Sequence, residues 1–203
     1  MSSPCTPSSP LPAELRDFVE RRLYLVIYGP PATGKTRVAY ELARYAISVG
    51  MDVVVLATEP GTLAYARNVV TCVPTVPILS IDELVETLVK AGSRGSFIVV
   101  DSINWPFRGY VTPSNLVRLS MISALLRRLG GVAVGQVTEY EGYEMALGRW
   151  VIPWAHVIAR SERLRCRRPV SSLSLVKPLG RTYEYELTGE GVRWLDGPVE
   201  GAC

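Results

Sequence analysis

Lysine is scarce in this sequence, although the chain is basic overall. Of the 22 Lys and Arg residues, only Lys35, Lys90 and Lys177 are lysines, and the formal net charge is +3. So small an excess of positive charge excludes an architectural protein that packs nucleic acid, and it leaves open a protein that contacts nucleic acid along one face. With so few lysines, each one can be examined for a specific role.

The sequence also lacks the clustered cysteines and histidines of a metal-binding protein. Cys5, Cys72, Cys166 and Cys203 are far apart, and His156 is the one histidine. There is no CxxC pair, so the spacing predicts neither a structural zinc site nor a disulfide framework. We expect isolated, reduced thiols, as in a cytoplasmic protein.

No apolar run approaches the ~20 residues that cross a membrane. The longest aliphatic stretches, such as 53–57, have the length of a β-strand, and the N-terminus has no apolar signal segment. We therefore expect a cytoplasmic protein without a membrane partner. Asn and Gln together number four, a scarcity of heat-labile amides that is typical of thermophilic proteins.

What is present is the composition of a globular protein. The 203 residues are 48% hydrophobic and 20% charged, enough for one domain with a buried core. Residues 1–12 hold four prolines and four serines without a periodic apolar pattern, which predicts a flexible tail. We expect residues 13–203 to form a single folded unit.

Apolar runs of strand length alternate with amphipathic segments over the first two thirds of the chain. This alternation predicts an α/β fold, with a mainly parallel sheet that is covered by helices on both faces. Asp82 and Thr112 are the expected N-caps of two of the helices. The expected strands are 23–28, 53–57, 76–80, 97–101 and 132–137, and the expected helices are 13–22, 35–48, 61–69, 82–91 and 113–129.

The pattern changes after Gly148, where strand-like stretches follow one another without helices between them. The stretches 155–166, 171–177 and 183–187 are separated by turn residues. They predict a C-terminal antiparallel β-meander that extends the sheet.

The segment from Gly29 to Thr36 fits the phosphate-loop pattern G-x-x-x-x-G-K-[ST]. It consists of Gly29, Pro30, Pro31, Ala32, Thr33, Gly34, Lys35 and Thr36, and it lies between a buried strand and an amphipathic helix, as the pattern requires. Backbone N–H groups of such a loop point at phosphate oxygens, and the helix N-terminus adds its dipole. Lys35 is expected to bind the β- and γ-phosphates of ATP, and Thr36 to bind Mg²⁺.

Two carboxylates lie at the ends of expected strands, where ligands bind in open α/β sheets. Asp101 ends the apolar run 97–100, and we expect it to hold Mg²⁺ together with Thr36. Glu59 follows strand 53–57, so it is a candidate for orienting a water molecule; position alone leaves a solvated loop glutamate equally open.

Several short motifs follow one another in collinear order from Leu23 to Val192. They are the stretch ATEPGT with Glu59, Asp101-Ser102 with Pro106-Phe107-Arg108, Gly135-Gln136-Val137, Gly148-Arg149-Trp150 with Trp154-Ala155-His156 and Arg160, and the closing stretch 183–192. Together they resemble the ATPase core of the RecA/RadA recombinase superfamily. The chain is most similar to the archaeal RadB-type paralogues, which consist of that core alone.

The resemblance implies a RecA-like P-loop NTPase fold and a role for Glu59 in activating water. For Gln136 it implies a contact to the γ-phosphate; from position alone, Gln136 could equally cap a strand end. The segment between Gln136 and Gly148 matches a DNA-binding loop of the family, but it carries Glu139, Glu141 and Glu144 and no Lys or Arg. Its negative charge would repel a phosphate backbone.

Two further groups of side chains are candidates for contacting nucleic acid. The densest positive cluster could neutralise DNA phosphates, or it could be a solvated strand edge; it comprises Arg160, Arg163, Arg165, Arg167 and Arg168. The aromatic residues Trp105, Phe107 and Tyr110, with Arg108, could stack on bases or cover the sheet.

The sequence therefore predicts a Mg-dependent ATPase of weak turnover that serves DNA recombination and repair as an accessory factor. Its expected partners are ATP, DNA, with single strands favoured, and a recombinase or other repair protein. Slow turnover is expected because no arginine finger can be assigned within the chain. The alternatives are a nucleotide-gated binding module for DNA or a recombinase, without significant hydrolysis, and a small P-loop kinase.

Overall fold

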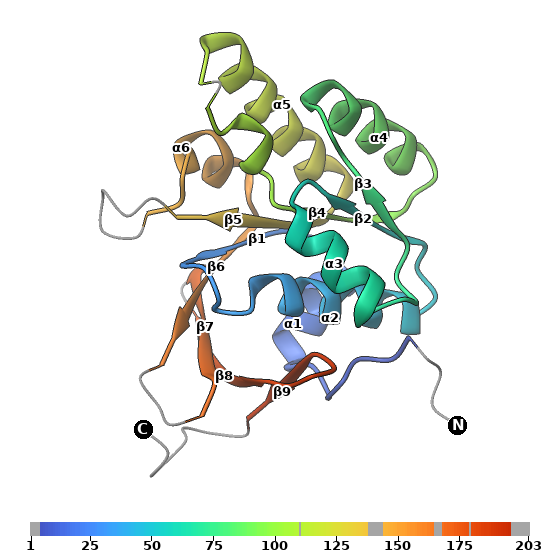
Figure 1. The fold of residues 1–203 in the computed structure, drawn as a ribbon, viewed down its shortest axis with the longest axis vertical. Helices are drawn as coiled ribbons and strands as arrows, with labels where there is room; N and C mark the ends of the chain where they lie inside the picture. Colours follow the sequence, from blue (N-terminus) through green and yellow to red (C-terminus); the bar gives the residue numbers. More distant parts are fainter. Residues whose placement is uncertain (1–4, 110, 138–143, 165–167, 179, 196–203) are drawn as a thin grey trace.

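A single sheet forms the framework of the computed structural model, which describes residues 5–109, 111–137, 144–164, 168–178 and 180–195 (Figure 1). Over these residues the sheet has nine strands, in the order β3-β2-β4-β5-β1-β6-β7-β8-β9. The strands are β1 (Tyr24–Gly29), β2 (Val53–Ala57), β3 (Thr75–Pro77), β4 (Phe97–Asp101), β5 (Gly131–Gln136), β6 (Val157–Arg163), β7 (Val170–Lys177), β8 (Thr182–Leu187) and β9 (Val192–Trp194).

The predicted α/β architecture is confirmed. In the order of the sheet, all neighbouring strands between β3 and β6 are parallel. The strands from β6 to β9 pair in antiparallel fashion, as expected for the C-terminal meander. In this register Ala57 of β2 lies beside Asp101 of β4, and Asp101 lies beside Val134 of β5. The carboxyl ends of the parallel strands therefore meet at one edge, next to the loop that follows β1.

Helices cover both faces of the parallel strands, with α4, α5 and α6 on one side and α1, α2 and α3 on the other (Figure 1). Thr112 caps α5 as predicted, whereas α4 begins one residue before Asp82, and the Ser80 side chain accepts the bond from the Glu83 N–H. Ser80 is an equally good capping residue, and the apolar Ile81 packs inward as the first residue of the helix. The helices are α1 (Ala13–Glu20), α2 (Lys35–Ser48), α3 (Pro60–Asn68), α4 (Ile81–Ser93), α5 (Pro113–Leu129) and α6 (Gly148–Val151), with 3-10 turns η1 (Trp105–Phe107) and η3 (Ile152–Trp154).

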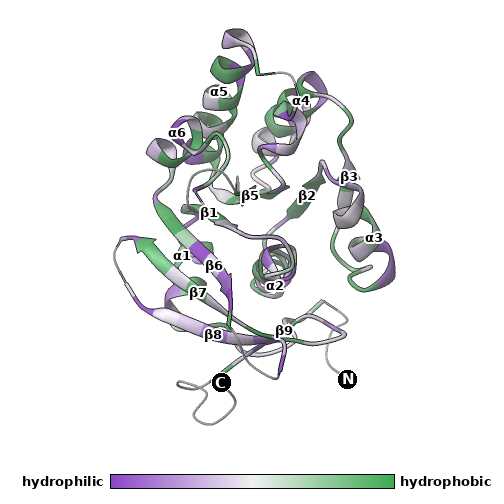
Figure 2. Cartoon of the chain, turned by 60° about the vertical axis from the view of Figure 1, so that its left-hand side comes forward, coloured by the Kyte–Doolittle hydropathy of each residue, from purple (hydrophilic) through white to green (hydrophobic). Residues whose placement is uncertain are grey.

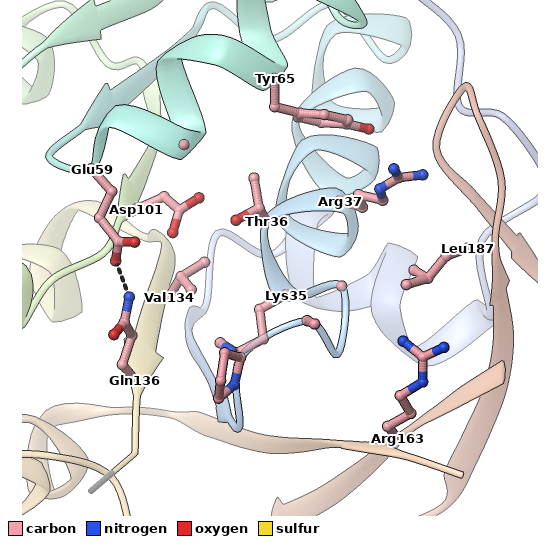
Figure 3. Close-up of a pocket in the computed structure, with 14 residues that line it drawn as sticks. Lys35, Thr36, Arg37, Glu59, Tyr65, Asp101, Val134, Gln136, Arg163 and Leu187 are labelled. Atoms are coloured by element: carbon pink, nitrogen blue, oxygen red, sulfur yellow. Dashed lines mark hydrogen bonds between the residues drawn. The ribbon is translucent and has the colours of Figure 1, made fainter. Parts of the chain in front are cut away.

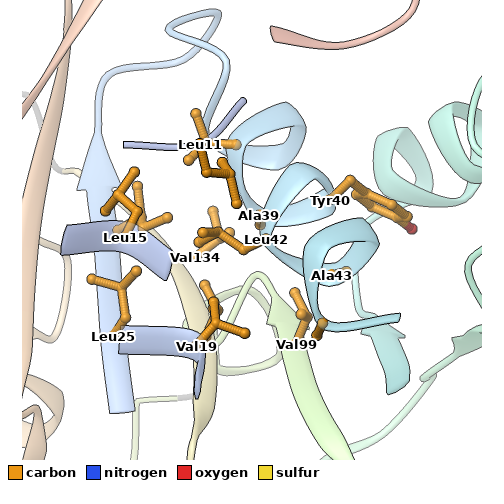
Figure 4. Packing of buried hydrophobic residues seen from close by; sticks show 14 of the residues in the cluster. Leu11, Leu15, Val19, Leu25, Ala39, Tyr40, Leu42, Ala43, Val99 and Val134 are labelled. Atoms are coloured by element: carbon orange, nitrogen blue, oxygen red, sulfur yellow. The ribbon is translucent and has the colours of Figure 1, made fainter. Parts of the chain in front are cut away.

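Two clusters of buried apolar side chains hold these layers together, one on each face of the sheet. In the cluster of Figure 4, Leu42 of α2 packs with Leu25, Val99 and Val134 of the strands. Figure 2 shows green and purple alternating along α4 and α5, the pattern of helices with one apolar face. Complete burial of a Leu or Val side chain contributes about 1.5–3 kcal/mol, so these contacts hold the strand ends in place.

The N-terminal segment differs from the flexible tail that its composition predicts. From residue 5 to residue 12 it packs along α2, and Cys5 and Leu11 belong to the core. The Ser8 N–H and hydroxyl donate to the two carboxylate oxygens of Glu41, at 2.6 and 2.7 Å. Glu41 is buried and also pairs with Arg44 at 3.2 Å. The segment is ordered because Ser8 gives this buried carboxylate two hydrogen bonds that Arg44 alone does not supply.

The expectation of reduced thiols is wrong for Cys5 and Cys72, which form a disulfide with their Cα atoms 5.5 Å apart. Spacing could not reveal this pair, because 67 positions separate the two residues and only the packing of the N-terminal segment brings them together. Cys166 and Cys203 lie outside the described residues. No helix among the described residues is long and apolar enough to cross a membrane.

His156 links the first strand to the start of the meander, and its protonation should weaken the fold. Its ring Nδ1 accepts from the Tyr24 backbone N–H at 3.0 Å, and the backbone N–H of His156 donates to Tyr24 O at 3.0 Å. Burial, followed by the charges of Arg127 and Lys177, lowers the pKa of His156. A lowered pKa means that the unfolded chain binds the proton more readily, so acid favours unfolding.

We therefore expect the contribution of His156 to stability to be complete above pH ~6.5 and to be lost as pH falls through the lower pKa of the folded chain. His156→Asn keeps an acceptor near the Tyr24 N–H but does not titrate. Urea unfolding between pH 5 and 8 should show a smaller loss of stability on acidification for this variant than for the parent chain. Equal pH profiles would contradict the assignment.

Candidate functional site

The phosphate-loop segment forms the turn between β1 and α2. Gly34 is the N-cap of α2 and has a φ of 94°, a left-handed conformation that favours glycine. A Cβ atom at Gly34 would also collide with the Leu187 side chain of β8. The sequence pattern and the local backbone therefore agree at this position. The 14-residue helix α2 begins at the next residue, so its N-terminal N–H groups face the loop.

Lys35 is buried at the base of this loop. Only 7% of its surface is exposed, and its Nζ donates to Pro30 O at 2.6 Å. Burial lowers the pKa of Lys35 to about 8, against the opposing effect of the Asp101 and Glu59 charges. The ammonium group thus donates to a loop carbonyl, and an incoming anion could replace that carbonyl as its hydrogen-bond partner.

Asp101 lies at the end of β4 and is 2% exposed. Its carboxylate accepts from the Thr62 hydroxyl at 2.9 Å and from the side chain of Thr36. Burial raises the pKa of Asp101 to about 6; the hydrogen bonds from Thr36 and Thr62 and the charge of Lys35 act in the opposite direction. The Thr36 hydroxyl and the Asp101 carboxylate therefore lie next to each other.

Glu59 immediately precedes α3, and Gln136 ends β5. The two meet through a hydrogen bond from Gln136 Nε2 to Glu59 Oε1 of 2.5 Å, drawn as the dashed line in Figure 3. The same oxygen accepts from the Ser102 hydroxyl. Glu59 therefore faces Asp101 and Gln136 at the sheet edge.

These side chains surround one cavity of about 510 Å³ (Figure 3). Glu59, Asp101 and Gln136 lie at one end, and Tyr65, Arg37 and Leu187 lie toward the other. The complete lining is Pro31, Ala32, Gly34, Lys35, Thr36, Arg37, Glu59, Gly61, Tyr65, Asp101, Val134, Gln136, Arg163 and Leu187. The cavity falls within the 300–1,000 Å³ that is usual for small-molecule sites.

Several of the lining and supporting residues were not predicted from sequence. Thr62 lies three positions after Glu59, the N-cap of α3, so the helical repeat could have placed the two side chains on the same side. Arg37 contacts Tyr65 with its guanidinium 5.5 Å from the ring centroid, and it donates to the carbonyl of Thr188. Nothing in the local sequence connects Leu187 with the phosphate loop.

The meander supports the loop from behind. The Tyr185 hydroxyl of β8 donates to Thr33 O at 2.7 Å and lies 2.8 Å from the Ser161 hydroxyl. Tyr185 is fully buried. The C-terminal strands therefore help to position the phosphate loop, a connection that only the tertiary structure shows.

The predicted arginine cluster does not form one surface in the described part of the chain. Arg160 pairs with Glu162 at 2.7 Å, and Arg163, although exposed, lies at the lining of the cavity. Arg168 is exposed, while Arg165 and Arg167 lie outside the described residues. Successive residues of a strand point to opposite faces of the sheet. Residues 160 and 163 are three positions apart, so their side chains lie on opposite faces.

The aromatic group is also divided. Trp105 is 37% exposed and lies 5.1 Å from the Arg108 guanidinium, whereas Phe107 is buried in the core and cannot stack on a base. Tyr110, and with it Glu139 and Glu141, lies outside the described residues.

The sequence matches no model of a known protein family and no curated protein.

Among the described residues, no group of three or more His, Cys, Asp and Glu side chains is arranged to hold a metal ion. The oxygen atoms of Thr36 and Asp101 suit Mg²⁺, which is commonly bound by one or two carboxylates together with the phosphates of a substrate.

Proposed function

We propose that this chain is a RecA-like P-loop ATPase core that binds Mg·ATP, hydrolyses it slowly, and acts as an accessory factor in DNA recombination and repair. The observation that carries the proposal is the convergence of Lys35, Thr36, Asp101 and Glu59 on one cavity, although they come from three separate segments. The resemblance of the sequence motifs to the RecA/RadA superfamily supports the recombination role.

The phosphate loop would bind the triphosphate. Lys35 would leave Pro30 O and donate to the β- and γ-phosphates, while the N–H groups at the start of α2 bind phosphate oxygens. The nucleoside would extend toward Tyr65 and Leu187, which supply apolar surface at the far end of the cavity. Arg37 holds Tyr65 in place from the side.

Thr36 and Asp101 would hold Mg²⁺, which neutralises charge on the phosphates when it is bound. Asp101 needs to be ionised for this role. Its hydrogen bonds from Thr36 and Thr62, and the charge of Lys35, favour the ionised form against burial.

Glu59 would orient the attacking water at the terminal-phosphate end of the cavity. The water oxygen forms a bond to the γ-phosphorus as the bond from phosphorus to the β–γ bridging oxygen breaks, which yields ADP and inorganic phosphate. Glu59 would accept a hydrogen bond from the water, and Gln136, which lies beside Glu59, would contact the γ-phosphate through its amide.

Slow turnover is expected even though an arginine lines the cavity. In Figure 3 Arg163 lies on the side of Leu187, across Lys35 from Glu59 and Gln136. Its guanidinium therefore faces the nucleoside end of the cavity, where it would not stabilise charge that develops at the γ-phosphate. Such stabilisation accounts for 10³–10⁵-fold in enzymes that have an arginine finger.

One observation favours the second candidate, a nucleotide-gated binding module without significant hydrolysis. Glu59 Oε1 accepts from both Gln136 and Ser102, so a water molecule would have to compete with these two donors for that oxygen in this state. ATPase rates and DNA binding measured together over a salt series distinguish the two candidates. Turnover at background level with single-stranded DNA present, despite tight ATP binding, would favour the module. A small P-loop kinase would instead phosphorylate a nucleoside monophosphate or a small alcohol.

The nucleotide site itself is tested by Lys35→Ala. We expect the parent chain to bind ATP with Mg²⁺, and the variant to bind it roughly 10- to 150-fold more weakly, because a charged hydrogen-bond donor contributes about 1.5–3 kcal/mol. Isothermal titration calorimetry measures the change. Lys90→Ala is the matched control, since Lys90 is exposed and pairs with Glu86 on α4. A parent chain that binds no ATP, or a Lys35→Ala variant of unchanged affinity, would overturn the assignment.

A further inference from the structure

An exposed arginine outside the cavity is connected to Glu59 through a single side chain. Arg108 Nη2 donates to Gln136 Oε1, and Gln136 Nε2 donates to Glu59 Oε1 at 2.5 Å. We call these three residues the Arg108–Gln136–Glu59 relay. Arg108 does not line the cavity, and its direct hydrogen-bonded connection to the site runs through Gln136.

The main chain of Gln136 is held firmly, which leaves its side chain as the part that can move. Asn104 is 1% exposed, and its side chain donates to Gln136 O at 3.0 Å and accepts from Gln136 N at 3.2 Å. The Ala146 N–H also donates to Gln136 O, at 2.8 Å. A change at Gln136 is therefore a rotation of its amide group, with the strand end unchanged.

The present arrangement of the relay weakens Glu59 as a partner for water. Oε1 already accepts from Gln136 and Ser102, so a water molecule must compete with these two donors for that oxygen. Arg108 adds to this effect because it fixes the carbonyl end of the Gln136 amide, so that the NH₂ end points at Glu59.

We propose that Arg108 is a positioning residue that holds Gln136 against Glu59 and keeps the nucleotide-free site in a resting state. The inference rests on the proposed ATP site. To reach the terminal phosphate of ATP, Gln136 must turn its amide away from Arg108. The free energy needed to break the Arg108 contact lowers the apparent affinity for ATP. ADP has no terminal phosphate at this position, so its binding does not include this cost.

The position of Arg108 fits the role of a releasable contact. The side chain is exposed, and its guanidinium stacks over Trp105, with 5.1 Å between the guanidinium carbon and the ring centroid. The contact with the Trp105 ring does not involve the Gln136 amide, so it can hold the guanidinium after the hydrogen bond to Gln136 is broken. Release therefore does not leave a buried charge without a partner.

The Arg108→Ala variant of the full chain tests this role. We expect it to bind ATP roughly three- to tenfold more tightly than the parent, because the cost of breaking one hydrogen bond is removed, and to bind ADP with unchanged affinity. Calorimetric titrations with each nucleotide, in the presence of Mg²⁺, measure the two dissociation constants. Where turnover is measurable, kcat should rise by a similar factor. Arg108→Lys keeps a donor for Gln136 and should restore the parent values.

Arg149→Ala is the matched control, because Arg149 stacks in the same way over Trp150, at 5.5 Å, without contacting Gln136. Its affinity for ATP should equal that of the parent. In a Gln136→Leu background, Arg108→Ala should have no further effect. An equal change in ATP and ADP affinity, weaker ATP binding, or no change at all in Arg108→Ala would overturn the relay alone. A parent chain that binds neither nucleotide would overturn the relay together with the proposed function.

Discussion

The Glu59→Gln variant is expected to bind ATP about as tightly as the parent chain and to hydrolyse it roughly 10²- to 10⁴-fold more slowly. The amide is nearly the same size as the carboxylate, and its oxygen can still accept from Gln136 and Ser102. Binding should therefore be preserved. An amide cannot accept the proton of the attacking water, so the loss should be confined to kcat.

The measurement is a steady-state ATPase assay combined with calorimetric ATP titration of the same preparations. Glu86→Gln is the matched control, since Glu86 lies on the outer face of α4, where it pairs with Lys90. That variant should keep the parent rate. Unchanged turnover in Glu59→Gln would remove Glu59 from the catalytic role, and a parallel loss of ATP affinity would show that its role is to support the cavity.

The second large effect concerns stability. We expect replacement of Cys5 and Cys72 by serine to lower the free energy of unfolding by about 4 kcal/mol, because the disulfide closes a long loop in the unfolded chain. The loop spans a sequence separation of 67 residues. Loss of the crosslink also loosens the segment that covers Glu41, whose carboxylate depends on Ser8 for two of its hydrogen bonds.

Urea unfolding with and without a reducing agent measures this effect. The reductant should lower the stability of the parent chain to that of the Cys5→Ser/Cys72→Ser double variant, and it should leave the double variant unchanged. The double variant therefore serves as the control for other effects of the reductant. A parent chain whose unfolding midpoint does not respond to reductant would contradict the disulfide's contribution.

Much of the fold could be predicted because its signals are local. The bounds of α2, β2, β4 and α5 agree with the expected ranges, since each is a continuous apolar or amphipathic run that ends at a glycine, a capping residue or a charge. The start of α4 was misplaced because Ser80 and Asp82 are both good N-caps, and the choice depends on the inward packing of Ile81.

The candidate site divides in the same way. The phosphate loop and Asp101 could be located because a turn between strand and helix, and a carboxylate at a strand end, are properties of consecutive residues. Thr62 and Tyr65 were not predicted as site residues, although they lie on α3, the helix that begins directly after Glu59. Arg163 was assigned to an outer surface; it is exposed, and it also lines the cavity, which the sequence did not indicate.

By itself, the sequence determined the α/β order of elements, the turn 29–36 with Lys35 and Thr36 between a strand and a helix, and the acidic residue that ends β4. The tertiary structure alone decided the Cys5–Cys72 disulfide, the support of Thr33 by Tyr185, and the relay from Arg108 to Glu59. The physical reason is range: turns, caps and strand periodicity depend on neighbouring residues, whereas these contacts join residues 28 to 152 positions apart. Such contacts form only when the sheet and its two layers of helices have packed.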